Sequence, residues 1–262
     1  MAGEQMRGQA PRIFLTGASS GIGAALARHY AERGAVLGLA SRSASQLAAL
    51  AASLPGSHSI HPVDVADPDA MAAAAAAFMA RAGTPDIVIA NAGVSVGTLT
   101  AEAADLPIFR RVVETNLFGM VNTFAPFIAP MTEARRGTLA GVASVAGIRG
   151  LPGSGAYCAS KAAAIAYLES LRGELRGSGI RVVTLAPGYI ATPMTAANPY
   201  RMPFILPPDV AARRLARAID AGCSWAVVPW QMSIVAKLLR LLPDPLFDRL
   251  FASAGRKPRQ PA

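Results

Sequence analysis

Short apolar runs alternate with longer helical segments along most of this 262-residue chain. The expected strands cover residues 12–15, 36–40, 59–63, 86–90, 137–143, 180–186 and 225–229. The expected helices cover residues 21–33, 45–54, 68–81, 106–130, 156–176 and 207–221, with Pro126 interrupting or ending the fourth. Because parallel strands need crossover connections, this alternation predicts an α/β fold, a doubly wound parallel sheet of about seven strands with helices on both faces.

Composition indicates how the chain is divided and where it resides. It is 52% hydrophobic and 16% charged, which allows a sizeable core. We expect a flexible tail over 1–11, one domain over 12–230, and an amphipathic helical extension with a basic tail over 231–262. The polar start predicts no signal peptide, and the two cysteines, Cys158 and Cys223, fit a reduced, cytoplasmic setting.

The net charge of +9 admits anionic partners. Arginines scattered over solvated surfaces are the simpler explanation of this charge. We expect no nucleic-acid partner, because aromatic residues are sparse and no zinc-finger spacing occurs, and we expect no metal site.

A glycine-rich turn follows the first expected strand and opens the first expected helix. Its residues are Thr16, Gly17, Ala18, Ser19, Ser20, Gly21, Ile22 and Gly23. A helix amino terminus offers unpaired N–H groups to an anion, and glycine permits close approach of the backbone. In this position the turn predicts a dinucleotide site rather than an ordinary tight turn.

The end of the second expected strand bears on which dinucleotide binds. An acidic residue there typically accepts the ribose hydroxyls of NAD, whereas a 2′-phosphate needs positive charge. This chain has Ser41 and Arg42, which can donate hydrogen bonds to phosphate. We therefore expect NADP(H) in preference to NAD(H), unless Arg42 merely lies on a solvated loop.

Four side chains have the chemistry for proton transfer. Tyr157 and Lys161 lie four residues apart, on one face of a helix. A nearby ammonium and an oxidised nicotinamide would lower the pKa of Tyr157, which could then act as general acid or base. Ser144 can orient a carbonyl oxygen, and Asn116 could hold a water that relays protons to Lys161.

With these motifs in order, the chain resembles the short-chain dehydrogenase/reductase family in its single-domain branch, over about residues 12–230. The resemblance rests on the glycine turn, Asn91-Ala92-Gly93, the Asn-Ser-Tyr-Lys set, and Pro187-Gly188 with Thr192 following. It implies a Rossmann-type fold and a catalytic tetrad of Asn116, Ser144, Tyr157 and Lys161. It also implies cofactor contacts from Asp64, Val65, Asn91, Ala92, Gly93, Pro187, Gly188, Ile190 and Thr192. Asp64 could instead form a turn, and Asn91 could stabilise the sheet.

The chain departs from the family's tetrameric members after the last expected strand. It has Val228-Pro229-Trp230 where those members carry Asp-Gly-Gly, and then continues for about thirty residues. We therefore expect a homodimer through the helices at 106–130 and 156–176.

The extension has a helical apolar pattern. Its first expected helix places Ile234, Val235, Leu238, Leu239, Leu241 and Leu242 on one face, and its second has Leu246, Phe247, Leu250 and Phe251. Asp244, between two prolines, is a candidate cap. Two interpretations remain open. One is a hairpin packed on the domain or on a dimer mate, and the other is peripheral membrane contact through residues 232–259.

The expected substrate loop, residues 189–207, predicts an apolar pocket. It contains Met194, Tyr200, Met202, Phe204 and Ile205, and its only charged residue is Arg201. A small hydrophobic ketone, aldehyde or secondary alcohol fits this loop best. The alternatives are a 3-oxoacyl thioester of an acyl carrier, or a non-catalytic NADP-binding sensor, against which the complete tetrad argues.

Overall fold

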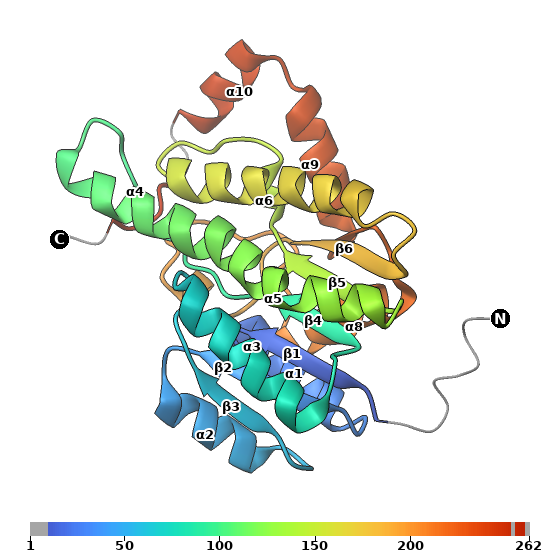
Figure 1. Cartoon of the computed structure of the whole chain (residues 1–262). Coiled ribbons are helices and arrows are strands. Elements are labelled where there is room, and N and C mark those ends of the chain that lie inside the picture. Colours follow the sequence, from blue (N-terminus) through green and yellow to red (C-terminus); the bar gives the residue numbers. More distant parts are fainter. Residues whose placement is uncertain (1–9, 253–254, 260–262) are drawn as a thin grey trace.

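The computed structural model describes residues 10–252 and 255–259, so most of the expected tail at 1–11 lies outside it. One parallel sheet runs through the molecule in the order β3-β2-β1-β4-β5-β6-β7 (Figure 1). Its strands are β1 (Arg12–Thr16), β2 (Val36–Ser41), β3 (Ser59–Pro62), β4 (Ile87–Ala90), β5 (Gly137–Val142), β6 (Ile180–Pro187) and β7 (Trp225–Val228). The predicted doubly wound α/β fold is confirmed.

Helices cover both faces of this sheet (Figure 1). On one face lie α1 (Gly21–Ala31), α2 (Ala44–Ser53) and α8 (Pro208–Ala221). On the other lie α3 (Pro68–Ala82), α5 (Gly119–Glu133) and α6 (Gly155–Glu174). The remaining helices are α4 (Leu106–Val113), α7 (Pro193–Ala196), α9 (Gln231–Leu241), α10 (Asp244–Phe251) and the short turns Ala103–Asp105 and Val145–Gly147.

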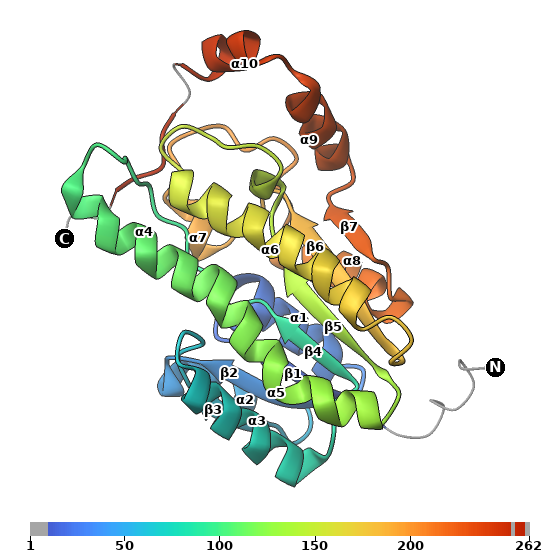
Figure 2. The ribbon, with the colours of Figure 1, turned by 45° about the horizontal axis from the view of Figure 1, so that its top comes forward.

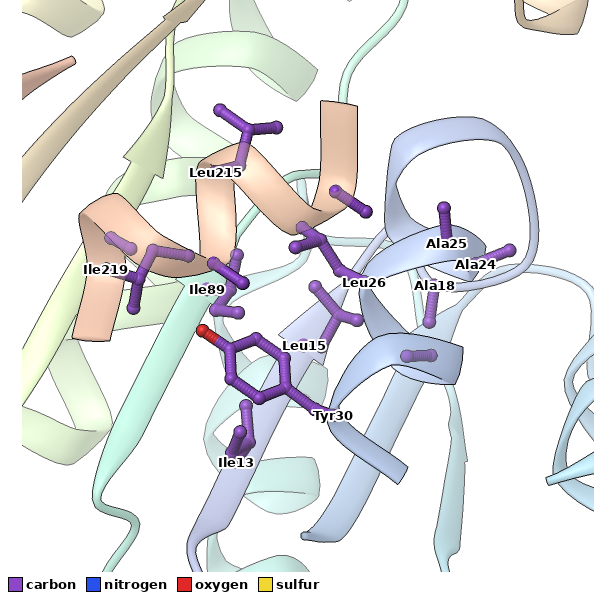
Figure 3. Close-up of a cluster of buried hydrophobic side chains, with 14 of the residues drawn as sticks. Ile13, Leu15, Ala18, Ala24, Ala25, Leu26, Tyr30, Ile89, Leu215 and Ile219 are labelled. Atoms are coloured by element: carbon purple, nitrogen blue, oxygen red, sulfur yellow. The ribbon is translucent and has the colours of Figure 1, made fainter. Parts of the chain in front are cut away.

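Alternation along the strands produces two separate cores. In β1, Ile13 and Leu15 face α1 and α8, while Phe14 faces α3 and α5. Figure 3 shows the first core, where Tyr30 of α1 reaches toward α8. Its hydroxyl donates a hydrogen bond to Asp220 at 3.1 Å. A polar group at the edge of this core is thereby satisfied.

The long helix expected at 106–130 differs from its prediction. It consists of α4, a π-helical turn (Glu114–Phe118) and α5, and it continues past Pro126 to Glu133. Pro126 neither ends nor interrupts it. Burial of Phe124 and Phe127 explains the continuation of the helix. Burying each side chain stabilises the fold by roughly 1.5–3 kcal/mol, which together offsets the cost of about 3 kcal/mol for a proline inside a helix.

Of the C-terminal helices, α9 follows β7 and packs against the end of the sheet, while α10 lies farther out (Figure 2). The apolar face expected for α9 is not buried as a unit: Leu238 and Leu241 are 63% and 79% exposed, while Val235 and Leu239 are half-buried. The buried residues of this helix are Met232 and Ala236, which the expected face did not include. Asp244 is not a cap, because Pro243 holds that position and Asp244 begins α10. No helix in the described part of the chain is long and apolar enough to span a membrane.

Candidate functional site

A cleft of about 270 Å³ lies at the carboxyl edge of the sheet, where strand-end loops meet. The expected site residues that line it are Gly17, Ser19, Ser20, Gly21, Ile22, Ser41, Arg42, Asp64, Val65, Asn91, Ala92, Gly93, Ser144, Tyr157, Lys161, Pro187, Gly188, Ile190 and Thr192. Of the expected residues, Asn116 and Gly23 do not line this cleft and lie behind its wall.

The glycine turn is closely packed against the end of β4. Gly17 has φ +65°, and a Cβ there would lie 2.7 Å from the Ala92 backbone. Asn91 Nδ2 donates hydrogen bonds to the carbonyls of Thr16 and Gly17, at 3.2 and 3.1 Å. Asn91 thus fixes the shape of the turn and also lines the cleft. Its position is compatible with both roles expected for it, stabilising the structure and contacting a cofactor.

The end of β2 carries an unsatisfied polar atom. Ser41 Oγ is buried and has no hydrogen-bond partner among the described residues. Arg42 beside it is exposed, lines the same cleft and forms no ion pair within the described chain. A buried hydroxyl without a partner is costly, so this corner fits a bound polar group such as a phosphate oxygen. The residues present therefore fit a dinucleotide.

Tyr157 lies near the amino end of α6, close to the end of β5. Burial raises the pKa of its phenol, and a side-chain hydrogen bond with Ser144 acts in the opposite direction. Lys161 Nζ lies 6.0 Å from the ring centroid, and desolvation has the largest effect on this pKa in the protein without cofactor. The expected lowering of the pKa needs the Lys161 ammonium and an oxidised nicotinamide together, and it stays a prediction.

Lys161 is buried, with 4% of its surface exposed. Its Nζ donates a hydrogen bond to the Val142 carbonyl at 2.7 Å. Burial lowers the pKa of Lys161 to about 8. An ammonium that loses its hydration in this way is stabilised by any further oxygen acceptor in the cleft.

Asn116 sits in the π-helical turn and is fully buried. Its Oδ1 accepts from the Val94 backbone at 2.8 Å, and its Nδ2 donates to the Val94 carbonyl and Ser160 Oγ, both at 3.0 Å. The amide therefore ties the loop after β4 to α6. A Cβ on Gly93 would lie within 3.5 Å of both Asn116 Oδ1 and Lys161 Nζ, so the two side chains do approach one another.

Other expected residues serve the local backbone. Asp64 Oδ1 accepts from the Ala66 backbone at 3.0 Å, as a turn former does. Thr192 is the N-cap of α7 and forms a capping box with Thr195. Met194, expected in the substrate loop, also lines the cleft. Sequence reasoning missed α7 and these further lining residues: Val63, Val94, Thr115, Val142, Ala143, Pro193 and Thr195. The Thr-Pro-Met-Thr sequence is a helix-start signal that could have revealed α7.

Comparison with known proteins agrees with this geometry. The family model described as short chain dehydrogenase matches residues 11–201. An uncharacterized oxidoreductase from Myxococcus xanthus is 39% identical over 238 residues, covering 90% of this chain and 94% of the relative.

Two solved structures are also similar. An alcohol dehydrogenase from Thermococcus sibiricus, complexed with 5-hydroxy-NADP, has a TM-score of 0.75 at 26% identity, covering 84% of this chain and 96% of that one. A 3-oxoacyl-[acyl-carrier protein] reductase from Brucella melitensis, with bound NAD, has a TM-score of 0.74 at 31% identity, covering 84% and 90%. Sequence, fold and cleft agree, and the chain belongs to the short-chain dehydrogenase/reductase family of NAD(P)-binding oxidoreductases.

Proposed function

We propose that this protein is an NADP(H)-dependent oxidoreductase that interconverts a hydrophobic ketone or aldehyde and the corresponding alcohol. The observation that carries the proposal is that Ser144, Tyr157 and Lys161 line one cleft together with the glycine turn. A proton donor and a dinucleotide cradle in one cleft are the two parts that carbonyl reduction requires.

Each side chain has a role that follows from its surroundings. When bound, the nicotinamide supplies or accepts the hydride. Ser144 orients the carbonyl oxygen, and Tyr157 donates a proton to the developing alkoxide. Burial raises the pKa of Tyr157, so its phenol holds a proton until negative charge develops on the substrate oxygen. Lys161 holds positive charge close by, and Asn116 fixes the loop over it.

The preference for NADP(H) rests on the corner at the end of β2. Within the described residues the Ser41 hydroxyl has no hydrogen-bond partner and Arg42 forms no ion pair, so both are available to hold a 2′-phosphate, which NAD lacks. Similarity to the Thermococcus enzyme, complexed with an NADP derivative, supports NADP(H). The similar Brucella enzyme has bound NAD, so the affinities for both cofactors need to be measured.

The substrate class follows from the segment around α7. Met194, Phe204 and Ile205 are exposed apolar residues, and Tyr189 packs edge-on against Tyr200 at 6.4 Å. Of these, Met194 lines the cleft, and an apolar side chain left open in a ligand site favours an apolar substrate. A 3-oxoacyl thioester is the second candidate, favoured by similarity to the Brucella reductase.

The test is a rate comparison across substrates. NADPH and NADH oxidation would be followed with aliphatic and aromatic ketones, aldehydes and 3-oxoacyl thioesters. The proposal expects NADPH-dependent turnover that improves with the apolar size of the ketone. Turnover restricted to thioesters would favour the second candidate, and NADPH binding without turnover of any compound would favour a sensor.

We also propose a cytoplasmic homodimer that pairs through α4–α5 and α6. Phe118, at the end of the π-helical turn, is 55% exposed although it is large and apolar. Burial of such side chains is typical of dimer interfaces. Light scattering would give twice the chain mass for the wild type and the monomer mass for Phe118→Asp. A monomeric wild type would contradict this proposal.

Peripheral membrane contact through residues 232–259 stays a separate prediction. Ile234, Leu238 and Leu241 form an exposed apolar strip on α9, with Lys237 and Arg240 beside it. Co-sedimentation with anionic vesicles should be lost in Leu238→Asp. Unchanged partitioning of that variant would contradict membrane contact.

A further inference from the structure

The segment 255–259 returns from α10 to the active-site end of the molecule. In Figure 2 it descends toward the loop before α4. The Pro258 carbonyl accepts a hydrogen bond from the Gly97 backbone at 3.0 Å. Arg259 pairs with Asp105 at 2.8 Å and with Glu102 at 3.3 Å. A backbone hydrogen bond and two ion pairs thus fix this segment against the loop that follows β4.

This arrangement brings Lys257 beside the proposed proton donor. Lys257 Nζ lies 5.6 Å from the Tyr157 ring centroid, comparable with the 6.0 Å of Lys161 Nζ. Nζ donates a hydrogen bond to Ser95 Oγ at 2.6 Å. The Tyr157 ring therefore has two ammonium groups near it, and one comes from a segment about a hundred residues away in sequence.

The charge of Lys257 is not matched by a carboxylate. Its neighbour Arg259 takes up both nearby acids, Glu102 and Asp105. Within residues 10–252 and 255–259, Lys257 forms no ion pair. The side chain is half-buried, and burial lowers the pKa of Lys257 to about 8. Removing an ammonium from water without an anionic partner is unfavourable, so an anion brought there is bound strongly.

We propose that Lys257 is a specificity-determining residue that binds a carboxylate carried by the substrate. The inference rests on the proposed function and narrows its substrate class to oxo acids and hydroxy acids with an apolar chain. The reacting carbonyl would lie at Ser144 and Tyr157, the chain along the apolar segment around α7, and the carboxylate at Lys257. Ser95 Oγ accepts from Lys257, and its hydroxyl proton could be donated to the same carboxylate.

A purely structural role for Lys257 makes a different prediction. If its hydrogen bond to Ser95 only fastens the segment 255–259, its removal would harm every substrate alike. If it binds a carboxylate, the loss would fall on charged substrates. Matched pairs of an oxo acid and its methyl ester separate these roles, because the ester keeps the chain and the ketone but removes the charge.

The experiment uses the full chain and a series of aliphatic oxo acids of increasing ketone-to-carboxylate spacing, each with its methyl ester. Variants are Lys257→Met, Lys257→Arg and, as a matched control, Lys237→Met on the exposed side of α9. For the wild type, we expect kcat/KM to be higher for the oxo acid than for its methyl ester at one ketone-to-carboxylate spacing. Lys257→Met should lower the acid-to-ester ratio of kcat/KM by ten- to a hundredfold, as loss of a charged hydrogen bond does. Lys257→Arg should keep the ratio within a few-fold, and Lys237→Met should not change it.

A binding measurement separates this inference from the reductase proposal. Calorimetry would titrate decanoate and methyl decanoate into the protein with NADP⁺ present. Decanoate affinity should fall at least tenfold in Lys257→Met, while ester affinity should not change. If no ketone is reduced but this difference appears, the reductase proposal fails and the carboxylate site stands. Equal loss for acid and ester, an unchanged ratio, or no decanoate binding to the wild type would overturn the inference.

Discussion

Lys161 Nζ donates a hydrogen bond to the backbone carbonyl of Val142, 2.7 Å away, at the carboxyl end of β5. The ammonium is thereby fixed in the wall of the cleft, where burial removes most of its hydration shell. Such a position favours a ligand oxygen near Lys161 but is unfavourable for the protein alone. The buried ammonium of Lys161 therefore favours ligand binding but lowers the stability of the protein without ligand.

We predict that Lys161→Met stabilises the protein without cofactor. The pKa of Lys161 falls from 10.5 to about 8 on folding, so its burial costs roughly 3 kcal/mol below pH 8. This cost fades as pH rises from 8 to 10.5, because the unfolded chain also loses the proton. After about 1 kcal/mol for the lost hydrogen bond, the variant should gain roughly 2 kcal/mol at pH 7.

Thermal unfolding at two pH values checks this prediction. The Tm of Lys161→Met should exceed the wild-type value by about 4 °C or more at pH 7, and the difference should shrink toward pH 10. A lower Tm at pH 7, or a difference independent of pH, would contradict the account. Lys161→Met should also have lost reductase activity, so a single substitution would raise stability and remove function.

Arg42→Ala should weaken NADPH binding selectively. Loss of a charge-assisted pair with phosphate costs about 1.5–3 kcal/mol, so the Kd for NADPH should rise roughly ten- to a hundredfold. The Kd for NADH should stay within about threefold, since it has no 2′-phosphate. Nicotinamide fluorescence measures both, with the exposed Arg28→Ala on α1 as control. Equal weakening of both cofactors would disprove selective recognition by Arg42.

Two glycine-to-alanine changes in helices should have opposite effects. At Gly23 in α1, a Cβ would collide with the Gly17 carbonyl and lie 2.7 Å from Asn91 Nδ2. Gly23→Ala should therefore distort the glycine turn and abolish detectable NADPH binding. At Gly173 in α6 there is open space, and alanine should stabilise the fold by about 0.5–1 kcal/mol. Chemical denaturation and cofactor titration of both variants test the contrast, and unimpaired binding by Gly23→Ala would refute it.

Arg149 joins the C-terminal helices to the domain. Its guanidinium donates to the carbonyls of Leu239 and Leu242, pairs with Asp244 at 2.7 Å, and lies 4.0 Å from the Phe247 ring centroid. Arg149→Ala leaves two carbonyls without this donor, so we expect about 2 kcal/mol of destabilisation. Hydrogen exchange should rise over α9 and α10 but not over the sheet. Arg240→Ala, which loses one 3.4 Å contact, is the control. Unchanged exchange in Arg149→Ala would show that the helices are held by other contacts.

The parts of the structure that the sequence predicts well are those governed by local pattern. The alternation of apolar strands with helices predicts the parallel sheet, because its strands are buried on both faces. The position of the glycine turn and the other motifs directly after strands predicts the cleft, because the strand ends meet at one edge of the sheet. The continuation of α5 through Pro126 was not predictable locally, since burial of Phe124 and Phe127 decides it. The position of Lys257 beside Tyr157 depends on Arg259 meeting Asp105, a contact between distant segments that no pattern reveals.

The most direct test of the central claim is NADPH oxidation with the best ketone substrate, by the wild type and by Tyr157→Phe, with NADPH affinity measured for both. The account predicts that kcat falls roughly 10²- to 10⁴-fold in the variant, as for loss of a general acid. NADPH affinity should stay within about threefold, because the glycine turn and Arg42 are untouched. Turnover at the wild-type rate by Tyr157→Phe would contradict the claim that Tyr157 donates the proton in this cleft.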